Sequence, residues 1–337
     1  RFADFGELTT VYIGGGTPSL WPVDLLERWL NKVRTHFQLS KDVEVTLELN
    51  PEDANLDHLK AIRDMGVNRL SIGAQSLDDD VLRRLGRSHR KNDVIRCVEL
   101  VRTAGFTNWN VDLIHGLVGQ SLASVLLDVR RILDLDTPHL STYQLTVEPG
   151  TPFGQREERG ETLNVDEGLL VAMYQAIINL NETNGRIQYE ISNAASPGFE
   201  SRHNLGYWMG RPYLALGTGA HGFCPKVEGA ERYANHAGVR NYITSVSRAN
   251  DWLDLPCEMT QQTADECIED QLMTGLRLQC GIEPTRKMED CYGQTVQILV
   301  NEGLMTAEAG RWSASKKGRM VLDFVIERIL SDSMVLT

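Results

Sequence analysis

Short runs of β-branched and apolar residues alternate with longer amphipathic segments through the first two-thirds of the 337-residue chain. This alternation constrains the fold more than any other feature, because parallel neighbouring strands cannot be joined by tight turns and need a crossover helix. It predicts an α/β fold, either a barrel or an open doubly wound sheet. The expected strands are 9–13, 43–48, 67–72, 110–114, 139–144 and 187–191, and the expected helices are 22–37, 56–65, 78–85, 92–104, 122–135 and 165–181.

The alternation ends near residue 225, so we expect one domain at 1–225 and a second at 226–337. Residues 226–250 are polar and irregular, and helices dominate after them. Two short strands around a glycine-containing turn lie between expected helices at 288–301 and 319–330, which resembles a winged-helix layout. The second domain is therefore predicted to be mainly helical, with a winged-helix-like hairpin.

Charge and cysteine content limit the classes of partner and compartment. The chain has 34 Lys and Arg residues against 46 Asp and Glu residues, a net charge of −12. Residues 226–332 hold 12 basic and 17 acidic residues, whereas phosphate neutralisation needs a basic face, so no nucleic-acid partner is expected. No run of about 18 apolar residues is present, so no transmembrane segment is expected. Six cysteines without Cys-x2-Cys spacing indicate reduced thiols in a cytoplasmic protein.

Polar or glycine-rich groups follow each of the first five expected strands. In parallel α/β folds the chemistry gathers at the carboxyl ends of the strands, so these groups are expected at one rim. The glycine run 14–16 lets a ligand lie on backbone, and its amides can bind carboxylate, amine-bearing or phosphate groups. The other rim candidates are Glu48, Gln75, Arg87, Asp112 and the segment 144–149.

Each candidate also has a purely structural explanation. The glycine run can form a tight turn without a ligand, and Glu48 can belong to a structural ion pair. Arg87 can be an ordinary surface arginine. Asp112 is the polar exception in an apolar strand, and a buried acid needs a partner. His115 lies just beyond that strand. It could act as a ligand, as a proton carrier or only as a capping residue of a turn, and the last interpretation is favoured.

Four segments, 12–19, 47–51, 71–76 and 112–117, together resemble radical S-adenosylmethionine (SAM) proteins of the oxygen-independent coproporphyrinogen III oxidase group. The resemblance covers nearly the whole chain in the same order. It implies a partial, three-quarter TIM-like barrel of parallel strands, here without its first strand. It also implies a SAM site lined by Gly15, Gly16, Thr17, Glu48, Gln75, Arg87, Asp112 and Thr146.

A later run, His203-Asn204-Leu205-Gly206-Tyr207-Trp208, is similar to a signature of the heme-chaperone (HemW-type) branch. An imidazole suits heme iron, and aromatic rings suit a flat porphyrin. The resemblance implies heme as the bound group, with His203, Tyr207, Trp208 and, more weakly, His221 as candidates. It further implies delivery of heme to acceptor proteins such as respiratory cytochromes. A structural alternative is that His203 and Asn204 only pin a loop against the barrel.

The chain departs from this family in its cysteines. The family's Cys-x3-Cys-x2-Cys motif should lie well before the glycine run, yet only thirteen residues precede Gly14. A [4Fe–4S] cluster needs thiolates, and no cysteine here has the required spacing, so no metal ligands are expected in this chain. The start at Arg1 without a methionine favours an N-terminal segment that was removed or left out over a natural cluster-less relative.

Several readings stay open from the sequence. One is coproporphyrinogen III oxidase activity, the oxidative decarboxylation that yields protoporphyrinogen IX. Another is a barrel enzyme whose glycine loop binds a phosphorylated substrate. The missing cysteines leave enzymatic turnover undecided. The sequence does not determine the oligomeric state, and a homodimer is compatible with it.

Overall fold

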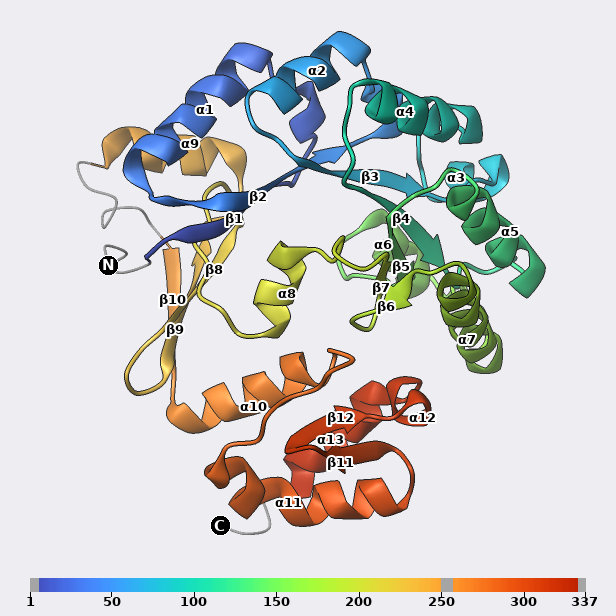
Figure 1. Ribbon diagram of the computed structural model, residues 1–337, viewed down its shortest axis with the longest axis vertical. Helices are drawn as coiled ribbons and strands as arrows, with labels where there is room; N and C mark the ends of the chain where they lie inside the picture. The colour runs from blue at the N-terminus through green and yellow to red at the C-terminus, as the bar shows by residue number, and fades with distance from the viewer. Residues whose placement is uncertain (1–5, 250–256, 333–337) are drawn as a thin grey trace. The chain divides into compact units, whose positions relative to one another are not determined.

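A computed structural model of the chain describes residues 6–249 and 257–332. The chain divides into two compact units, Arg1–His203 and Asn204–Thr337. The first unit holds a seven-stranded sheet in the order β1-β2-β3-β4-β5-β7-β6, in which β1 to β5 are parallel (Figure 1). Its strands are β1 (Leu8–Ile13), β2 (Leu39–Leu49), β3 (Arg69–Gln75), β4 (Trp109–His115), β5 (His139–Gln144), β6 (Ile187–Gln188) and β7 (Asn193–Ala195).

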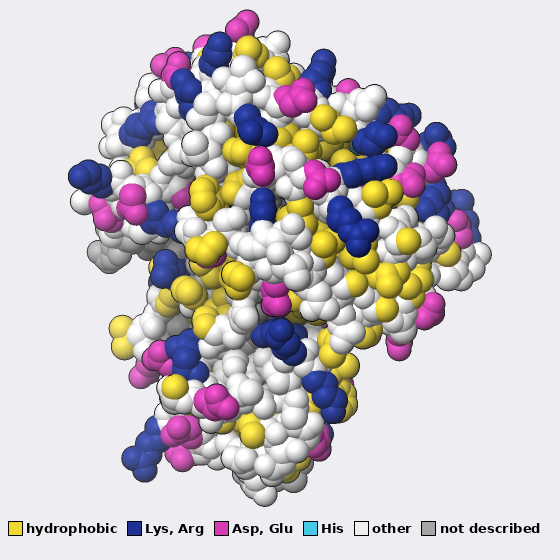
Figure 2. Space-filling model, turned by 45° about the vertical axis from the view of Figure 1, so that its right-hand side comes forward, with side chains coloured by type: hydrophobic (Ala, Val, Ile, Leu, Met, Phe, Trp, Pro, Cys, Tyr) yellow, Lys and Arg dark blue, Asp and Glu magenta, His cyan; other side chains and the backbone are white. Residues whose placement is uncertain are grey.

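Helices connect the parallel strands and lie along one side of the sheet (Figure 1). They are amphipathic: in α1, Leu26, Leu30 and Val33 are buried, while Glu27, Arg28, Asn31 and Lys32 are exposed. Figure 2 shows Lys and Arg side chains interspersed with Asp and Glu on the visible face. The helices are α1 (Val23–His36), α2 (Leu56–Asp64), α3 (Asp79–Arg84), α4 (Lys91–Thr103), α5 (Leu122–Leu133), α6 (Pro152–Glu158) and α7 (Glu167–Thr183), with 3-10 turns at Pro18–Leu20 and Pro51–Asp53.

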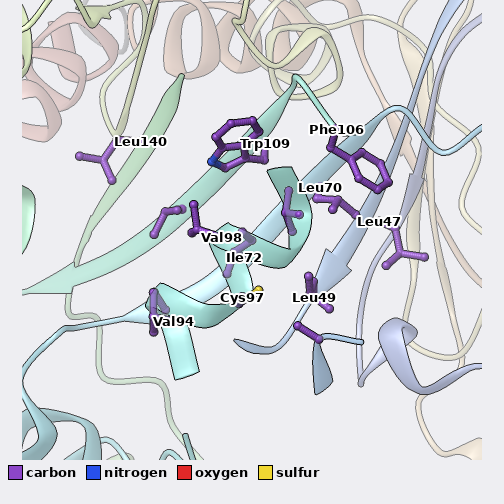
Figure 3. Close-up of a cluster of buried hydrophobic side chains, with 14 of the residues drawn as sticks. Leu47, Leu49, Leu70, Ile72, Val94, Cys97, Val98, Phe106, Trp109 and Leu140 are labelled. Carbon is purple, nitrogen blue, oxygen red and sulfur yellow. The ribbon is translucent and has the colours of Figure 1, made fainter. Parts of the chain in front are cut away.

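The hydrophobic core of the first unit lies between the helices and one face of the sheet. Successive strand residues point to opposite faces, so the apolar set of each strand occupies alternate positions. Leu47 and Leu49 of β2 are almost fully buried, and Figure 3 shows them in one cluster with residues of β3, β4 and α4. The labelled members from those elements are Leu70, Ile72, Trp109, Val94, Cys97 and Val98. The opposite face of the sheet is left to polar side chains.

The second unit combines a small antiparallel sheet with helices and a hairpin. The sheet has the order β10-β9-β8, and the hairpin pairs β11 with β12. Helix α8 (Arg202–Trp208) begins at the end of the first unit. The other elements are β8 (His221–Pro225), β9 (Ala230–Asn235), α9 (Val239–Arg248), β10 (Cys257–Gln262), α10 (Ala264–Gly275), α11 (Arg286–Asn301), β11 (Met305–Glu308), β12 (Arg311–Ala314), α12 (Lys316–Arg319) and α13 (Leu322–Asp332).

The predicted parallel α/β architecture and the helical C-terminal region with its hairpin are confirmed. Two local expectations are wrong. Of the strand expected at 187–191 only Ile187–Gln188 forms a strand, β6, and the next strand, β7, lies beyond that range and runs antiparallel to β5. Residues 226–250, expected to be irregular, contain β9 and α9, because the polar strand β9 is stabilised by pairing on both edges rather than by an apolar face.

The two units divide earlier than the boundary expected after residue 225. That boundary would separate β8 from β9, its hydrogen-bonded neighbour, whereas the division between His203 and Asn204 keeps the small sheet whole. Within residues 6–249 and 257–332, no helix combines the length and apolarity needed to cross a membrane.

Candidate functional site

The inner face of the large sheet, opposite the helices, carries polar side chains on four neighbouring strands. The register places Glu48 beside Ser71, Ser71 beside Asn110, and Asp112 beside Ser141. Because side chains alternate along a strand, residues two apart share a face. The polar positions are Glu44, Thr46, Glu48, Arg69, Ser71, Asn110, Asp112, His139 and Ser141.

The glycine loop after β1 is joined to Glu48. The backbone N–H of Gly15 donates to Glu48 Oε2 at 2.9 Å. Gly15 and Gly16 have φ angles of 80° and 63°, and a Cβ built on either would meet no atom within 4 Å. Both conformations favour glycine, and the backbone here is open to a ligand. Thr17 follows, half-buried, with its carbonyl accepting from Leu20 N at 3.1 Å.

Asp112 of β4 ends a chain of hydrogen bonds across the inner face. Asn110 Nδ2 donates to Asp112 Oδ1 at 2.7 Å, and Ser71 Oγ donates to Asp112 Oδ2 at 3.2 Å. Burial raises the pKa of Asp112, and hydrogen bonds from Asn110, Ser141 and Ser71 partly offset that rise. The buried acid therefore has the partners that its place in an apolar strand requires.

The network continues from Asn110 to His139 and Tyr189. His139 Nδ1 lies 2.7 Å from Asn110 Oδ1, and its Nε2 lies 2.7 Å from the Tyr189 hydroxyl. Burial, with the nearby Arg69 charge, holds the pKa of His139 well below its ordinary value. A neutral imidazole that donates through Nδ1 and accepts at Nε2 satisfies both contacts.

Gln75 and Arg87 are brought to the same end of the sheet by the backbone. Gln75 ends β3 with a φ of 65°, where the pairing with β4 shifts register. The loop carrying Arg87 is fastened beside it, because His89 Nε2 lies 2.9 Å from the Ala74 carbonyl oxygen. His89 Nδ1 also lies 3.3 Å from Glu52 Oε2, which anchors this loop to the turn after β2. The Arg87 side chain itself is exposed.

The remaining rim candidates are less constrained. Thr146 lies exposed in the segment after β5. His115 is only 3% exposed and borders a small cavity with Gln120 and Asp128, so it belongs to the helix-covered side of the sheet rather than to the rim. Burial lowers the pKa of His115 to about 4, so its imidazole is neutral near pH 7. The five parallel strands end at the same edge of the sheet. His115, however, points away from the polar face.

Arg69 supplies a positive charge within the inner face. It is 2% exposed and is the one buried Lys or Arg side chain among the residues that the structure describes. Its Nε has no hydrogen-bond partner among the described atoms. A buried guanidinium disfavours protonation of neighbouring imidazoles, and it contributes to the lowered pKa values of His139 and His203.

His203 is held at the start of α8 by three groups of the barrel. Its backbone N–H donates to Glu44 Oε1 at 3.0 Å, and its Nδ1 is hydrogen-bonded to Thr10 Oγ1 at 2.9 Å. Its ring stacks on Tyr12, with centroids 4.9 Å apart and planes inclined by 20°. Burial, and then Arg69, lower the pKa of His203 to about 4. The imidazole is therefore neutral and fixed in orientation.

The other heme candidates lie in the second unit. Tyr207 follows His203 by one turn of α8, and its ring meets Tyr213 edge to face at 4.6 Å. The Arg277 guanidinium lies over the Trp208 ring at 5.9 Å. His221 is the exposed first residue of β8. The indole and the phenol thus already have neighbours within their own unit.

Sequence reasoning named only Glu48 and Asp112 of this polar face; among the residues it missed are Tyr12, Arg69, Asn110 and His139. One sequence feature could have identified them: each is a polar residue that alternates with apolar residues along its strand. Within the described residues, no group of three or more His, Cys, Asp or Glu side chains is placed to hold a metal ion. The six cysteines are free thiols, one in the first unit and five in the second.

Comparison with known proteins agrees with this architecture. Residues 1–132 match the radical SAM superfamily. The structure of coproporphyrinogen III oxidase (HemN) from Escherichia coli, a radical SAM enzyme, superposes with a TM-score of 0.78 at 21% identity, covering 96% of this chain and 78% of that one. The matched segment is thus that of a radical SAM protein, and the fold agrees with it.

Curated relatives narrow the family further. The heme chaperone HemW of Lactococcus lactis is 33% identical over 97% of this chain and 86% of its own length. The heme chaperone HemW of Bacillus subtilis is 36% identical over 87% of this chain and 76% of its own length. The chain belongs to the HemW family of radical SAM proteins, which confirms the family resemblance. Membership of the superfamily implies SAM and a [4Fe–4S] cluster as cofactors.

Proposed function

We propose that the protein is a heme chaperone that binds SAM at the strand ends and heme near His203, and transfers heme to acceptor proteins such as respiratory cytochromes. The family assignment supports the chaperone role. The observation that carries the heme site is the neutral imidazole of His203, fixed by Thr10, Glu44 and Tyr12. The six free cysteines support a reducing, cytoplasmic location.

The residues present fit SAM. The molecule has a positively charged sulfonium, an ammonium group and ribose hydroxyls, and the inner face offers the carboxylates of Glu48 and Asp112 as acceptors. The open backbone at Gly15 and Gly16 admits close approach of a ligand. Gln75, Arg87, Thr17 and Thr146 lie at or beyond the same strand ends and complete the proposed SAM site. When bound with its cluster, SAM supplies radical chemistry.

A neutral histidine suits heme iron because the lone pair of one ring nitrogen is available only without a second proton. His203 meets this condition, since its pKa is about 4. Tyr207 and Trp208, next along α8, are the proposed aromatic contacts, with His221 as a weaker ligand candidate.

Heme titration of the purified chain, followed by its Soret band, tests the heme site. His203→Ala is expected to shift the Soret maximum and weaken heme binding by about tenfold or more, because an axial ligand is lost. His36→Ala is the matched control, since His36 is an exposed histidine at the end of α1 whose Nδ1 is hydrogen-bonded to the Lys32 carbonyl oxygen of the same helix. An unchanged spectrum and affinity in His203→Ala would remove the ligand role.

The SAM site has its own test. Glu48→Gln is expected to weaken SAM binding in equilibrium dialysis by about tenfold, because a charged acceptor is replaced by a neutral one. Equal retention of SAM by Glu48→Gln and wild type would contradict the site. Turnover of coproporphyrinogen III by the anaerobically reconstituted protein would contradict a chaperone-only role.

A further inference from the structure

Tyr12, near the end of β1, lies between the proposed SAM and heme residues of the first unit. Its hydroxyl donates to Glu48 Oε1 at 2.8 Å, while the other carboxylate oxygen accepts from Gly15 N at 2.9 Å. Its ring stacks on His203 at 4.9 Å between centroids. One side chain therefore contacts both the carboxylate beside the glycine loop and the imidazole at the start of α8.

The hydroxyl of Tyr12 remains a donor throughout the physiological pH range. Burial and then the adjacent charge of Glu48 raise the pKa of the phenol above its ordinary value. A neutral phenol that donates to an ionised carboxylate forms a charge-assisted hydrogen bond, which is stronger than a bond between neutral groups. The Tyr12–Glu48 contact is thus able to fix the direction of the carboxylate.

Close packing against Gly14 removes alternative positions for both side chains. A Cβ built on Gly14 would lie 2.6 Å from Tyr12 Cε1 and 2.8 Å from Glu48 Oε1. The ring and the carboxylate therefore rest against the Cα of this glycine. The backbone, the phenol and the carboxylate form a single packed unit at the end of β1.

We propose that Tyr12 is a positioning residue for both sites: its hydroxyl orients Glu48 toward SAM, and its ring orients His203 toward heme. This inference rests on the proposed function. The two roles depend on different parts of the side chain, because the hydroxyl contacts Glu48 and the aromatic face contacts His203. Substitutions that remove one part or both should therefore separate them.

Tyr12→Phe, Tyr12→Met and Tyr174→Phe are compared with wild type by equilibrium dialysis with SAM and by heme titration. Tyr12→Phe is expected to weaken SAM binding about tenfold and to leave the Soret maximum and heme affinity unchanged, because the ring remains. Tyr12→Met is expected to weaken SAM binding equally and also to weaken heme binding about threefold, with a shifted Soret band, because the stacked ring is lost.

Tyr174→Phe is the matched control. It removes a hydroxyl that donates to the Ile191 carbonyl oxygen at 3.1 Å in the same unit, so neither ligand should respond. Thermal unfolding of each variant accompanies the titrations. If Tyr12→Met does not fold, Tyr12→Phe, which keeps the ring, tests the role of Tyr12 alone through its SAM affinity.

Glu48→Gln and His203→Ala in the same assays keep the two ideas distinct. If they lose SAM and heme as expected, but Tyr12→Phe binds SAM like wild type or more tightly, the role of Tyr12 is wrong and the proposed function stands. Wild-type heme binding by a folded Tyr12→Met has the same consequence. If Glu48→Gln and His203→Ala themselves bind like wild type, the proposed function and the role of Tyr12 fail together.

Discussion

Gly14 has no room for a side chain because Tyr12 and Glu48 occupy the space that its Cβ would take. We expect Gly14→Ala to displace both groups, to weaken SAM binding about tenfold and to lower the free energy of unfolding by about 1–3 kcal/mol, the usual cost of overpacking. Equilibrium dialysis and urea denaturation measure the two effects. Gly293→Ala is the control, since its Cβ would meet no atom within 4 Å and alanine favours the helix by about 1 kcal/mol. Equal effects of the two substitutions would contradict the packing argument.

The lowered pKa of His203 predicts how heme binding depends on pH. Because its pKa is about 4, the imidazole is protonated only as the pH falls to about 4, so it is neutral at both pH 5.5 and pH 7.5. Heme affinity should therefore change little between these values and fall only as the pH approaches 4. For a histidine with an ordinary pKa near 6.5, the neutral fraction at pH 5.5 would be about tenfold lower than at pH 7.5. A tenfold drop in affinity at pH 5.5, measured by Soret titration, would show that burial does not control this histidine.

At the scale of elements, α8 depends on a carboxylate from β2. Glu44 is 5% exposed and accepts from the backbone N–H groups of Arg202 and His203 at 3.1 and 3.0 Å. Glu44→Gln leaves one of these donors without its acceptor, so we expect a loss of about 1–3 kcal/mol in the free energy of unfolding. We also expect a changed Soret spectrum, because the first turn of α8 carries His203.

Asp42→Asn provides the contrast for Glu44→Gln. Asp42 is paired with Arg202 at 3.0 Å, but its side chain is 80% exposed, and such surface pairs contribute less than about 1 kcal/mol. The Arg202 guanidinium also keeps its bond to the Asp42 carbonyl oxygen at 2.6 Å. Urea denaturation should therefore separate the two variants. Equal losses would mean that the ion pair, and not the buried acceptor, fixes α8.

Local rules predicted the elements of the first unit well. Gly66 and Gly105 lie just beyond α2 and α4 with φ angles of 104° and 89°, the left-handed conformation in which glycine commonly ends a helix. Strand alternation likewise puts Glu48 on the face opposite the buried Leu47 and Leu49. The antiparallel turn of β7 could not be predicted, because strand direction at the edge depends on long-range pairing. The stacking of His203 on Tyr12 could not be predicted either, because it is a long-range contact between residues 191 positions apart in the sequence.

At the scale of the whole molecule, several basic residues of the second unit are paired with acidic ones. Arg277 meets Asp323 at 3.0 Å, and Arg328 meets Glu302 at 2.6 Å. Arg232 is similarly paired with Asp270 at 2.6 Å, and Lys287 and Arg311 also contact carboxylates. Lys and Arg side chains that already form ion pairs with carboxylates contribute little to binding the phosphates of DNA. The hairpin of β11 and β12 resembles a winged helix in layout, but the net charge of residues 226–332, with 12 basic and 17 acidic residues, is negative.

These pairs predict that the protein does not bind duplex DNA. Association with phosphates is strongest at low salt, so fluorescence anisotropy of a labelled duplex at about 50 mM salt is the most sensitive measurement. We expect no saturable change, because the net charge of −12 repels the duplex and the paired arginines release few counterions. Saturable binding that weakens between about 50 and 200 mM salt would reveal a basic surface that the ion pairs do not neutralise. Replacing Asp323 with Asn and Glu302 with Gln would remove the acidic partners of Arg277 and Arg328. If these ion pairs keep the two arginines from phosphate, the double variant should show weak, salt-dependent DNA binding.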